Sequence, residues 1–289
     1  MNRGVVAGAL AALLGACSPS GLLNGFDRAV GGGGVDRAGR GIAFGDHGQR
    51  LDVWSKPAQG ASKRPVLVFF YGGGWVSGAR DQYGFAARAF ADNGFVVVVP
   101  DYRKVPQIRF PEFVVDAAQA VAWTRANAAR FGGDPDRIVL AGHSAGAYAV
   151  AMLALDRRWL VEEGVPDGTV KAGVGLSGPY DFFPFTSQRA VDAMYGVADP
   201  QTTQPIRFAR RDAPPLLLVT SSDDTVVRPH NAVNLGKKLE ELGASVEVRN
   251  YDGLSHEEVV MALSKPFRGK APVLADSVAF LERSLEREP

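Results

Sequence analysis

Residues 137 to 149 read RIVLAGHSAGAYA, and this stretch predicts a strand, a tight turn and a helix in immediate succession. The apolar run from Ile138 to Ala141 is typical of a buried strand, whereas the Ala-rich residues after the turn favour a helix. Ser144 lies in the turn, with Gly142 and Gly146 two residues away on either side. Side chains at both positions would collide with the neighbouring strand and helix, which explains the glycines. Such a turn holds the serine hydroxyl clear of the backbone, where a base can remove its proton.

The pattern G-x-S-x-G in this context resembles the nucleophile elbow of the α/β-hydrolases. The five residues alone are weak evidence in a chain with 34 glycines, and the alternative is an ordinary glycine-rich turn. The strand before and the helix after the turn favour the elbow. The resemblance implies an α/β fold with a mostly parallel central sheet, helices on both faces, and Ser144 as the nucleophile.

A second glycine-rich motif follows an earlier strand. The unbroken apolar run from Val66 to Phe70 predicts a buried strand, and the next five residues read YGGGW. Esterases of the hormone-sensitive-lipase and ferulic-esterase-like branches carry the similar motif HGGGW here. The resemblance implies an oxyanion hole formed by the backbone N–H groups of Gly73, Gly74 and Ala145. Tyr71 replaces the usual histidine, and a flexible glycine turn is the alternative.

Two further residues complete a predicted triad. Asp224 follows a buried strand at 216–220, and His256 follows an alternating strand at 245–251. The chain order Ser144, Asp224, His256 is the order expected for this fold. The carboxylate would fix the tautomer of the imidazole, which would then accept the serine proton. Asp223 is the competing acid.

The spacing of residues in this loop favours Asp224 over Asp223 as the acid. The family pattern is an Asp, a variable residue and then paired valines, which Asp224 to Val227 fits and Asp223 does not. We expect the two valines to pack the loop and hold the carboxylate in place. Among the 4 histidines, His47 lies in a predicted hairpin turn, His143 inside the elbow and His230 at a helix start, so His256 is the predicted base.

The rest of the chain predicts alternating strands and helices. The residues from Ile42 to Trp54 suit an edge hairpin, Phe95 to Pro100 a strand, and Pro111 the start of a helix. The tripeptide Asp101 to Arg103 also matches the family, where we interpret it as a structural polar cluster. The irregular stretch from Phe182 to Ala213 is rich in aromatic residues, which either wall an acyl pocket or pack the loop, and it is too short for a large lid.

The first residues predict export. The apolar run from Val5 to Ala16 is too short to span a bilayer but suits a signal peptide, and Leu13 to Cys17 resembles a bacterial lipobox. Cys17, the only cysteine, would be the lipidated N-terminus, although an ordinary secretory cleavage site is the alternative. We expect a signal segment at 1–17, a Gly-rich tether at 18–41 and a catalytic domain at 42–289. The protein would then lie in a bacterial cell envelope, anchored to the membrane and facing the periplasm or exterior.

The composition is that of an ordinary globular protein. The chain has 289 residues, of which 46% are hydrophobic and 22% charged, and its net charge is +1. Lys and Arg are scattered, so we expect no nucleic-acid partner. The resemblance implies a serine hydrolase that cleaves small-molecule carboxylic esters, of short-chain or aryl type, without a metal or organic cofactor. An arylformamidase or other amide hydrolase of the same fold, or an inactive envelope binding module, remains as an alternative.

Overall fold

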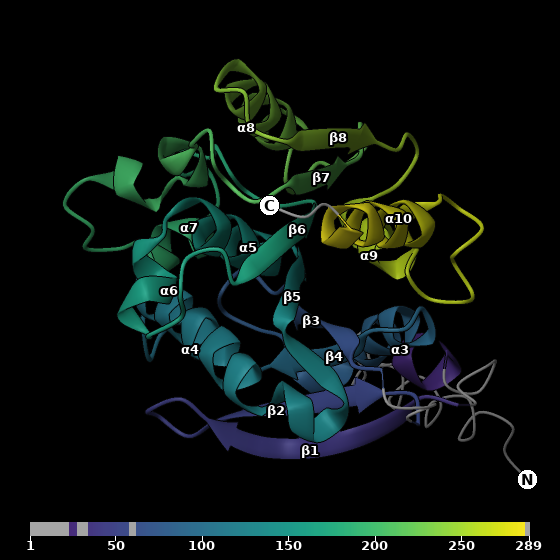
Figure 1. Cartoon of the computed structure of the whole chain (residues 1–289). Helices are drawn as coiled ribbons and strands as arrows, with labels where there is room; N and C mark the ends of the chain where they lie inside the picture. The colour runs from purple at the N-terminus through teal and green to yellow at the C-terminus, as the bar shows by residue number, and fades with distance from the viewer. Residues whose placement is uncertain (1–22, 28–33, 58–61, 287–289) are drawn as a thin grey trace, which may run out of the picture.

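The computed structural model describes residues 23–27, 34–57 and 62–286. These residues form one 8-stranded sheet in the order β1-β2-β4-β3-β5-β6-β7-β8 (Figure 1). The strands are β1 (Asp36–Phe44), β2 (Gln49–Ser55), β3 (Arg64–Phe70), β4 (Val96–Pro100), β5 (Gly133–His143), β6 (Val170–Leu176), β7 (Leu216–Thr220) and β8 (Val246–Asn250). The pairs from β4 to β8 are all parallel, whereas β2 is antiparallel to both β1 and β4. The predicted α/β fold and the predicted edge hairpin are confirmed.

Helices cover both faces of the sheet (Figure 1). On one face α4, α5 and α8 pack on the sheet, and on the other α3 and α10 do so. The longer helices are α3 (Gly84–Asp92), α4 (Glu112–Asn127), α5 (Ala145–Leu155), α8 (His230–Glu241) and α10 (Val273–Glu286). The shorter ones are α6 (Arg158–Glu162), α7 (Gln188–Ala193), α9 (His256–Met261) and the 3₁₀ turns η1 (Arg80–Tyr83), η2 (Ala128–Phe131), η3 (Pro200–Thr203) and η4 (Pro205–Phe208). Among the described helices, none is long and apolar enough to cross a membrane.

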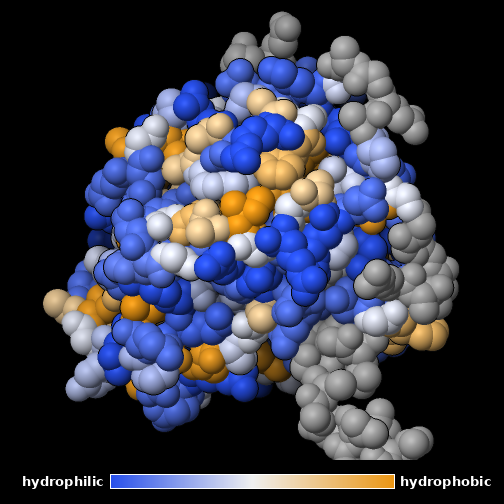
Figure 2. Space-filling view, turned by 90° about the horizontal axis from the view of Figure 1, so that it is seen from below, coloured by the Kyte–Doolittle hydropathy of each residue, from blue (hydrophilic) through white to orange (hydrophobic). Residues whose placement is uncertain are grey.

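The central strands are buried on both sides, because helices cover both faces. Every residue of β4 and β7 is buried, and so are the last five of β3, which explains why these strands read as continuous apolar runs. Strand β1 alternates between exposed and partly buried residues, as expected at an edge. Two shifts of register in its pairing with β2 and the charged residues Arg37 and Arg40 make this edge a poor template for another strand. Viewed from the β1 side, hydrophobic residues form small groups surrounded by hydrophilic ones (Figure 2).

The predicted boundary between tether and catalytic domain at residue 42 is wrong for the described part of this stretch. Strand β1 already begins at Asp36, and residues 23–27 form a short helix that packs on the domain. Asp27 is buried and accepts a hydrogen bond from Nε of the buried Arg88 on α3 at 3.0 Å. A buried charge requires such a partner, and Arg88 lies 61 residues away in sequence, so no local pattern reveals the contact. The predicted signal segment, including Cys17, lies outside the described residues.

The sheet brings the predicted site residues together at the carboxyl ends of its parallel strands. Parallel strands end at the same side of a sheet, and the segments after β3, β5, β7 and β8 carry the glycine motif, Ser144, Asp224 and His256 respectively. Strands β3 and β5 are direct neighbours, so the glycine motif and the elbow lie side by side.

Candidate active site

Ser144 occupies a strained backbone conformation between β5 and α5. Its φ of 54° and ψ of −120° lie in a region that residues with a side chain rarely adopt. The N–H of Ser144 donates to the carbonyl of Leu176 on β6 at 2.9 Å, which fixes the turn against the neighbouring strand. The side chain lines a pocket although the residue is only 8% exposed. The turn therefore exposes the hydroxyl to the cavity and shields the rest of the residue from solvent.

The two glycines of the elbow are required by close approach. A Cβ on Gly142 would lie 2.5 Å from backbone atoms of Gly146, and a Cβ on Gly146 would lie 2.0 Å from the carbonyl oxygen of Phe70. Real Cβ atoms do not come this close to backbone. The helix that follows Ser144 can therefore pack against the end of β3 only with glycine at these positions, as the sequence predicts.

Asp224 uses both carboxylate oxygens. Its Oδ2 lies 2.8 Å from Nδ1 of His256, and its Oδ1 accepts hydrogen bonds from the backbone N–H groups of Val226 at 2.9 Å and Val227 at 2.8 Å. Burial favours the neutral acid, but the hydrogen bond and charge of His256 together with the Val227 N–H outweigh it, so the pKa of Asp224 is lowered. The carboxylate is thus held ionised and fixed in direction.

The expected role of the paired valines is only half right. Val226 is 66% exposed, so it does not pack the loop as an apolar side chain. The two residues hold the carboxylate through their backbone N–H groups instead. The spacing indicated the acid that contacts His256, but the physical reason is the hydrogen bonding of the turn rather than the hydrophobicity of valine.

The neighbouring acid has a different partner. Oδ2 of Asp223 accepts a hydrogen bond from the N–H of Gly253 at 2.6 Å, in the loop that leads to His256. Ser221 Oγ similarly accepts from the N–H of Leu254 at 3.3 Å. Asp223 therefore ties the two loops together without contacting the imidazole.

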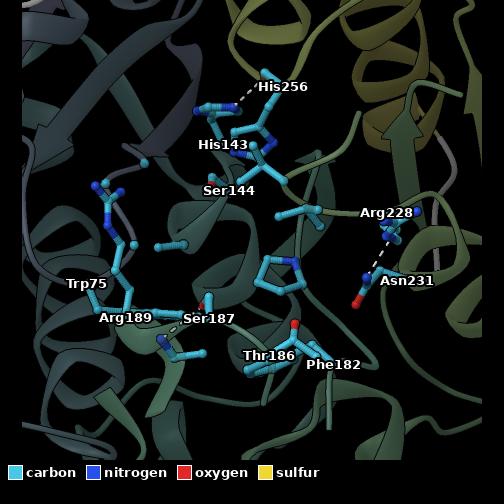
Figure 3. A pocket seen from close by; sticks show the side chains of 18 of the residues that line it. Trp75, His143, Ser144, Phe182, Thr186, Ser187, Arg189, Arg228, Asn231 and His256 are labelled. Atoms are coloured by element: carbon cyan, nitrogen blue, oxygen red, sulfur yellow. Dashed lines mark hydrogen bonds between the residues drawn. The ribbon is translucent and has the colours of Figure 1, made fainter. Parts of the chain in front are cut away.

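His256 is positioned by the hydrogen bond of its Nδ1 to Asp224 and by its own helix. Because Nδ1–H donates to Asp224, Nε2 carries a lone pair that can accept a proton. His256 is the first residue of α9, and Ser255 caps this helix in a capping box with Glu258. The ring lies beside Ser144 at the wall of the pocket (Figure 3).

The capping box gives a pH-dependent prediction. Ion pairing with Lys270 and hydrogen bonds from Ser255 lower the pKa of Glu258 from 4.5 to about 2. We expect Glu258→Ala to lower the free energy of unfolding at pH 7 by about 1 kcal/mol, mainly through the lost cap because solvent screens the ion pair. The carboxylate binds protons less readily when folded, so its contribution is complete above about pH 4.5 and is lost as pH falls toward 2.

Thermal or urea unfolding from pH 7 to 3 checks this prediction. The gap between wild type and Glu258→Ala should narrow below about pH 4.5. Glu257→Ala is the matched control on the same helix, since Glu257 is exposed and takes no part in the capping box. A gap of constant size over the whole pH range would contradict the assigned role of Glu258.

The glycine loop after β3 touches the elbow. A Cβ on Gly72 would lie 2.7 Å from Nδ1 of His143 and 3.1 Å from Cβ of Ser144. Gly73 and Gly74 have φ of 142° and 59°, and a Cβ on Gly73 would lie 2.1 Å from the carbonyl oxygen of Ser77. Only glycine fits this path. Within the described chain no hydrogen bond uses the N–H of Gly73 or Gly74, and Ala145 is the first residue of α5, where the N–H has no acceptor within the helix.

Tyr71 supports the glycine loop from the interior of the protein. Its ring is fully buried and stacks on Tyr102 at 4.7 Å and on Tyr83 at 5.8 Å between ring centres. Its hydroxyl donates to Oδ1 of Asp101 at 3.0 Å, and Asp101 also pairs with Arg80. The tripeptide that begins with Asp101 is thus structural, as interpreted from the sequence. A tyrosine in place of the usual histidine still fixes the loop, through stacking and this hydrogen bond.

A buried series of hydrogen-bonded polar groups links the glycine loop, the elbow and His256. Nε2 of His143 lies 3.1 Å from the carbonyl oxygen of His256, and Nδ1 lies 3.4 Å from the hydroxyl of Tyr83. Because a carbonyl only accepts, Nε2 carries the proton and Nδ1 accepts from Tyr83. Burial, and then the nearby His256, lower the pKa of His143 to about 3, so the ring is neutral. Burial raises the pKa of Tyr83 to about 12, although a hydrogen bond from the Gly72 N–H lowers it.

Sequence reasoning placed His143 beside the nucleophile but missed Tyr83, which precedes α3 and belongs to no motif. Of the other two histidines, His47 is exposed in the β1–β2 turn, whereas His230 lines the pocket with its Nε2 3.1 Å from the carbonyl oxygen of Asp181. Among the residues that the structure describes, no group of three His, Cys, Asp or Glu could hold a metal ion, and we assign no metal ligand.

The pocket in front of Ser144 has a volume of about 1030 Å³ (Figure 3). One wall is the stretch from Phe182 to Ala190, which confirms that part of the irregular segment lines a pocket rather than only packing on the body. Trp75 also lines the pocket, and its ring stacks with those of Phe113 at 5.8 Å and Phe182 at 6.0 Å. The aromatic residues that line the cavity give it apolar surface next to the polar groups around Ser144.

Comparison with known proteins agrees with this geometry. The sequence model of the family described as BD-FAE matches residues 51–239, which include the glycine loop, the elbow and Asp224. The chain belongs to the BD-FAE family. The family match ends before His256, so the pairing of His256 with Asp224 rests on the chain order and on the hydrogen bond in the structure.

Relatives of this BD-FAE protein include esterases. It is 35% identical to esterase LipC of Mycobacterium tuberculosis over 71% of this chain and 56% of the relative. It therefore spans just over half of that relative's length. Solved structures with the same fold include a carbohydrate esterase from gut microbiota, with a TM-score of 0.70, 20% identity and coverage of 82% and 91%. A thermophilic esterase of Thermogutta terrifontis with butyrate bound has a TM-score of 0.69, 22% identity and coverage of 86% and 97%.

Proposed function

We propose that this BD-FAE protein is a serine hydrolase that cleaves carboxylic esters through an acyl-enzyme. The observation that carries the proposal is the hydrogen bond between Asp224 and Nδ1 of His256, beside Ser144 in a strained turn that faces the pocket. This arrangement leaves Nε2 of His256 free to take the serine proton. The name of the relative LipC, an esterase, supports the choice of ester over amide.

The reaction would proceed in two halves. Ser144 Oγ forms a bond to the ester carbonyl carbon while its proton passes to Nε2 of His256. The N–H groups of Gly73, Gly74 and Ala145 would bind the negative oxygen that results. The bond to the alcohol oxygen then breaks, and the imidazolium returns its proton to this leaving group. A water molecule attacks the acyl-enzyme in the same way, releases the acid and restores Ser144.

A fluorophosphonate probe tests the proposal. Only a serine with an activated hydroxyl reacts with it, so wild type should be labelled at Ser144 and Ser144→Ala should not. Turnover of 4-nitrophenyl butyrate together with a matched anilide would then separate ester from amide hydrolysis. Absence of labelling and of turnover would favour the binding module instead. The buried and hydrogen-bonded Tyr71 supports an intact loop and therefore an active enzyme.

We further propose a preference for short-chain or aryl esters. The segment at 177–215 contains only short helices, 3₁₀ turns and loops, and residues of its first part, between 179 and 190, line the pocket. No described helix of this segment is long enough to form a lid over an extended lipid tail. We expect kcat/KM for 4-nitrophenyl esters to be highest for acetyl to butyryl chains and lower for chains of ten or more carbons. A series of chain lengths measured below the micelle concentration checks this. Higher kcat/KM for the longest ester would contradict it.

We also propose that Cys17 carries a lipid anchor and that the protein lies in a bacterial cell envelope. The apolar run that precedes Cys17 and the lipobox-like Leu13 to Cys17 support this. Several acyl chains bind a membrane stably, whereas one chain binds only marginally. We expect wild type to sediment with membranes and to enter the detergent phase. Cys17→Ser should be released or remain unprocessed, and wild type recovered in the soluble fraction would contradict the anchor.

A further inference from the structure

Arg189 is a cation of the pocket wall without an ionic partner. It lies on α7 and lines the pocket, and no described residue forms a hydrogen bond or ion pair with its guanidinium. Asp192, the acid on the same helix, accepts a hydrogen bond from Gln188 at 2.8 Å, and no ion pair joins it to Arg189. The charge of Arg189 is therefore not neutralised within the described part of the protein.

Arg189 lies close to the glycine loop. A Cβ on Gly74 would lie 2.9 Å from Cδ and 3.6 Å from Nη1 of Arg189. The aliphatic part of the arginine thus packs over Gly74, and the guanidinium lies next to the loop that would bind the developing oxyanion. Figure 3 shows the side chain rising along one wall to the level of Ser144, across the cavity from Arg228.

The base of Arg189 is fixed to the body of the protein. Ser187 caps α7 by accepting a hydrogen bond from the N–H of Ala190, and the carbonyl of Ala193 accepts one from the N–H of Phe110 at 2.9 Å. Ala190 and Ala193 are buried, so one face of α7 packs on the core while Arg189 faces the cavity. A guanidinium on an anchored segment loses less freedom when it binds a ligand than one on a mobile loop.

The other charges of the pocket do not occupy the same position. Arg228 and Asp181 lie on the opposite wall, where the N–H of Asp181 donates to the side chain of Asn231. Glu257 follows the base His256 on α9. Arg189 is therefore the cation that a ligand bound over Gly73 and Gly74 would meet.

We infer, on the basis of the proposed ester hydrolysis, that the preferred substrates carry an anionic group, of which a carboxylate is the simplest, and that Arg189 binds it. A guanidinium stays charged at all relevant pH values and can donate two parallel hydrogen bonds to a carboxylate. The ester carbonyl would lie at the glycine loop, and the carboxylate of the same substrate would extend to Arg189. The hydrolysis itself is unchanged: water cleaves the ester into an acid and an alcohol.

Matched ester pairs test this inference and locate the anion. On the acyl side, 4-nitrophenyl butyrate is compared with 4-nitrophenyl hemiglutarate, which adds a terminal carboxylate. On the alcohol side, phenyl butyrate is compared with 4-carboxyphenyl butyrate. The readout is the ratio of kcat/KM for the charged to the neutral ester, after subtraction of the uncatalysed rate. Differences in intrinsic reactivity cancel when this ratio is compared between wild type and variant.

We expect Arg189→Gln to lower this ratio by roughly tenfold in one of the two pairs, the size of a charge-assisted hydrogen bond at a partly exposed site. The wild-type ratio should also fall as salt is added, because ions screen the interaction. Arg207→Gln is the matched control, an exposed arginine on η4 outside the pocket, and should leave the ratio unchanged. Arg228→Gln should change it much less than Arg189→Gln. Thermal melts establish that each variant is folded.

Two outcomes separate this inference from the proposed function. If wild type hydrolyses the neutral esters but Arg189→Gln leaves both ratios unchanged, or if Arg228→Gln lowers them equally, the role of Arg189 is wrong and the esterase stands. If wild type hydrolyses neither member of either pair and is not labelled by the fluorophosphonate, the proposed function is wrong and this inference with it.

Discussion

Ser144→Ala is expected to lower kcat for any ester that this protein hydrolyses by on the order of 10⁶-fold, the size seen when a serine nucleophile is removed from a protease. No other hydroxyl can replace it, because the acyl group must bond to the atom that the turn presents to His256. KM should change much less. Steady-state kinetics with 4-nitrophenyl butyrate measures both parameters, and Ser62→Ala, an exposed serine outside the site, serves as the control.

Substitutions at Ser144 should also reveal how much free energy the strained turn costs the folded protein. Ser144 holds a φ of 54°, and such conformations cost about 1–3 kcal/mol for a residue with a side chain. We expect Ser144→Gly to be as inactive as Ser144→Ala but to unfold with a free energy about 1 kcal/mol higher, since glycine adopts this backbone without strain. Equal stabilities of the two variants would show that the turn stores no strain. Residual turnover above about 1% in either would contradict the assignment of the nucleophile.

The features that the sequence predicts correctly are those that depend on local chemistry. The elbow, the glycine loop and the buried strands each depend on a steric requirement that acts on a few adjacent residues. These residues therefore form patterns that can be recognised in the sequence. Asp224 was identified by spacing to Val226 and Val227, and the structure shows why the spacing works: those two N–H groups close a turn onto its carboxylate. The residue type mattered less than the position.

The features that the sequence did not predict depend on contacts between distant segments. The helix at 23–27 is held by Asp27 and Arg88, and the 3₁₀ turn η1 is tied to the elbow through Tyr83 and His143. Each of these pairs is separated by 60 residues or more, and neither contact leaves a periodic or motif-like trace. Arg189 likewise belongs to no motif of the sequence, and only the structure shows that it lies over Gly74. Proximity to segments distant in the sequence, rather than residue type, distinguishes these side chains.

Asp224→Asn is expected to lower kcat by about 10⁴-fold, as in a protease whose triad acid is replaced by asparagine. The carboxylate accepts the Nδ1 proton of His256 and thereby leaves Nε2 able to take the proton of Ser144. The amide group of an asparagine can instead donate to Nδ1, which favours the tautomer with the proton on Nε2. In that tautomer the imidazole cannot act as a base, although the fold and the pocket are preserved.

Asp223→Asn is the matched control and should cost less than about tenfold. Asp223 lies next to Asp224 in the chain, but its carboxylate accepts the N–H of Gly253, and the carbonyl oxygen of an asparagine can do the same. Measuring kcat for both variants side by side, with thermal melts to show that each is folded, separates chemistry from loop support. A near-normal Asp224→Asn with a crippled Asp223→Asn would move the catalytic acid by one residue. Loss of activity only in proportion to a lower melting temperature would mean that both acids act through the stability of the two loops.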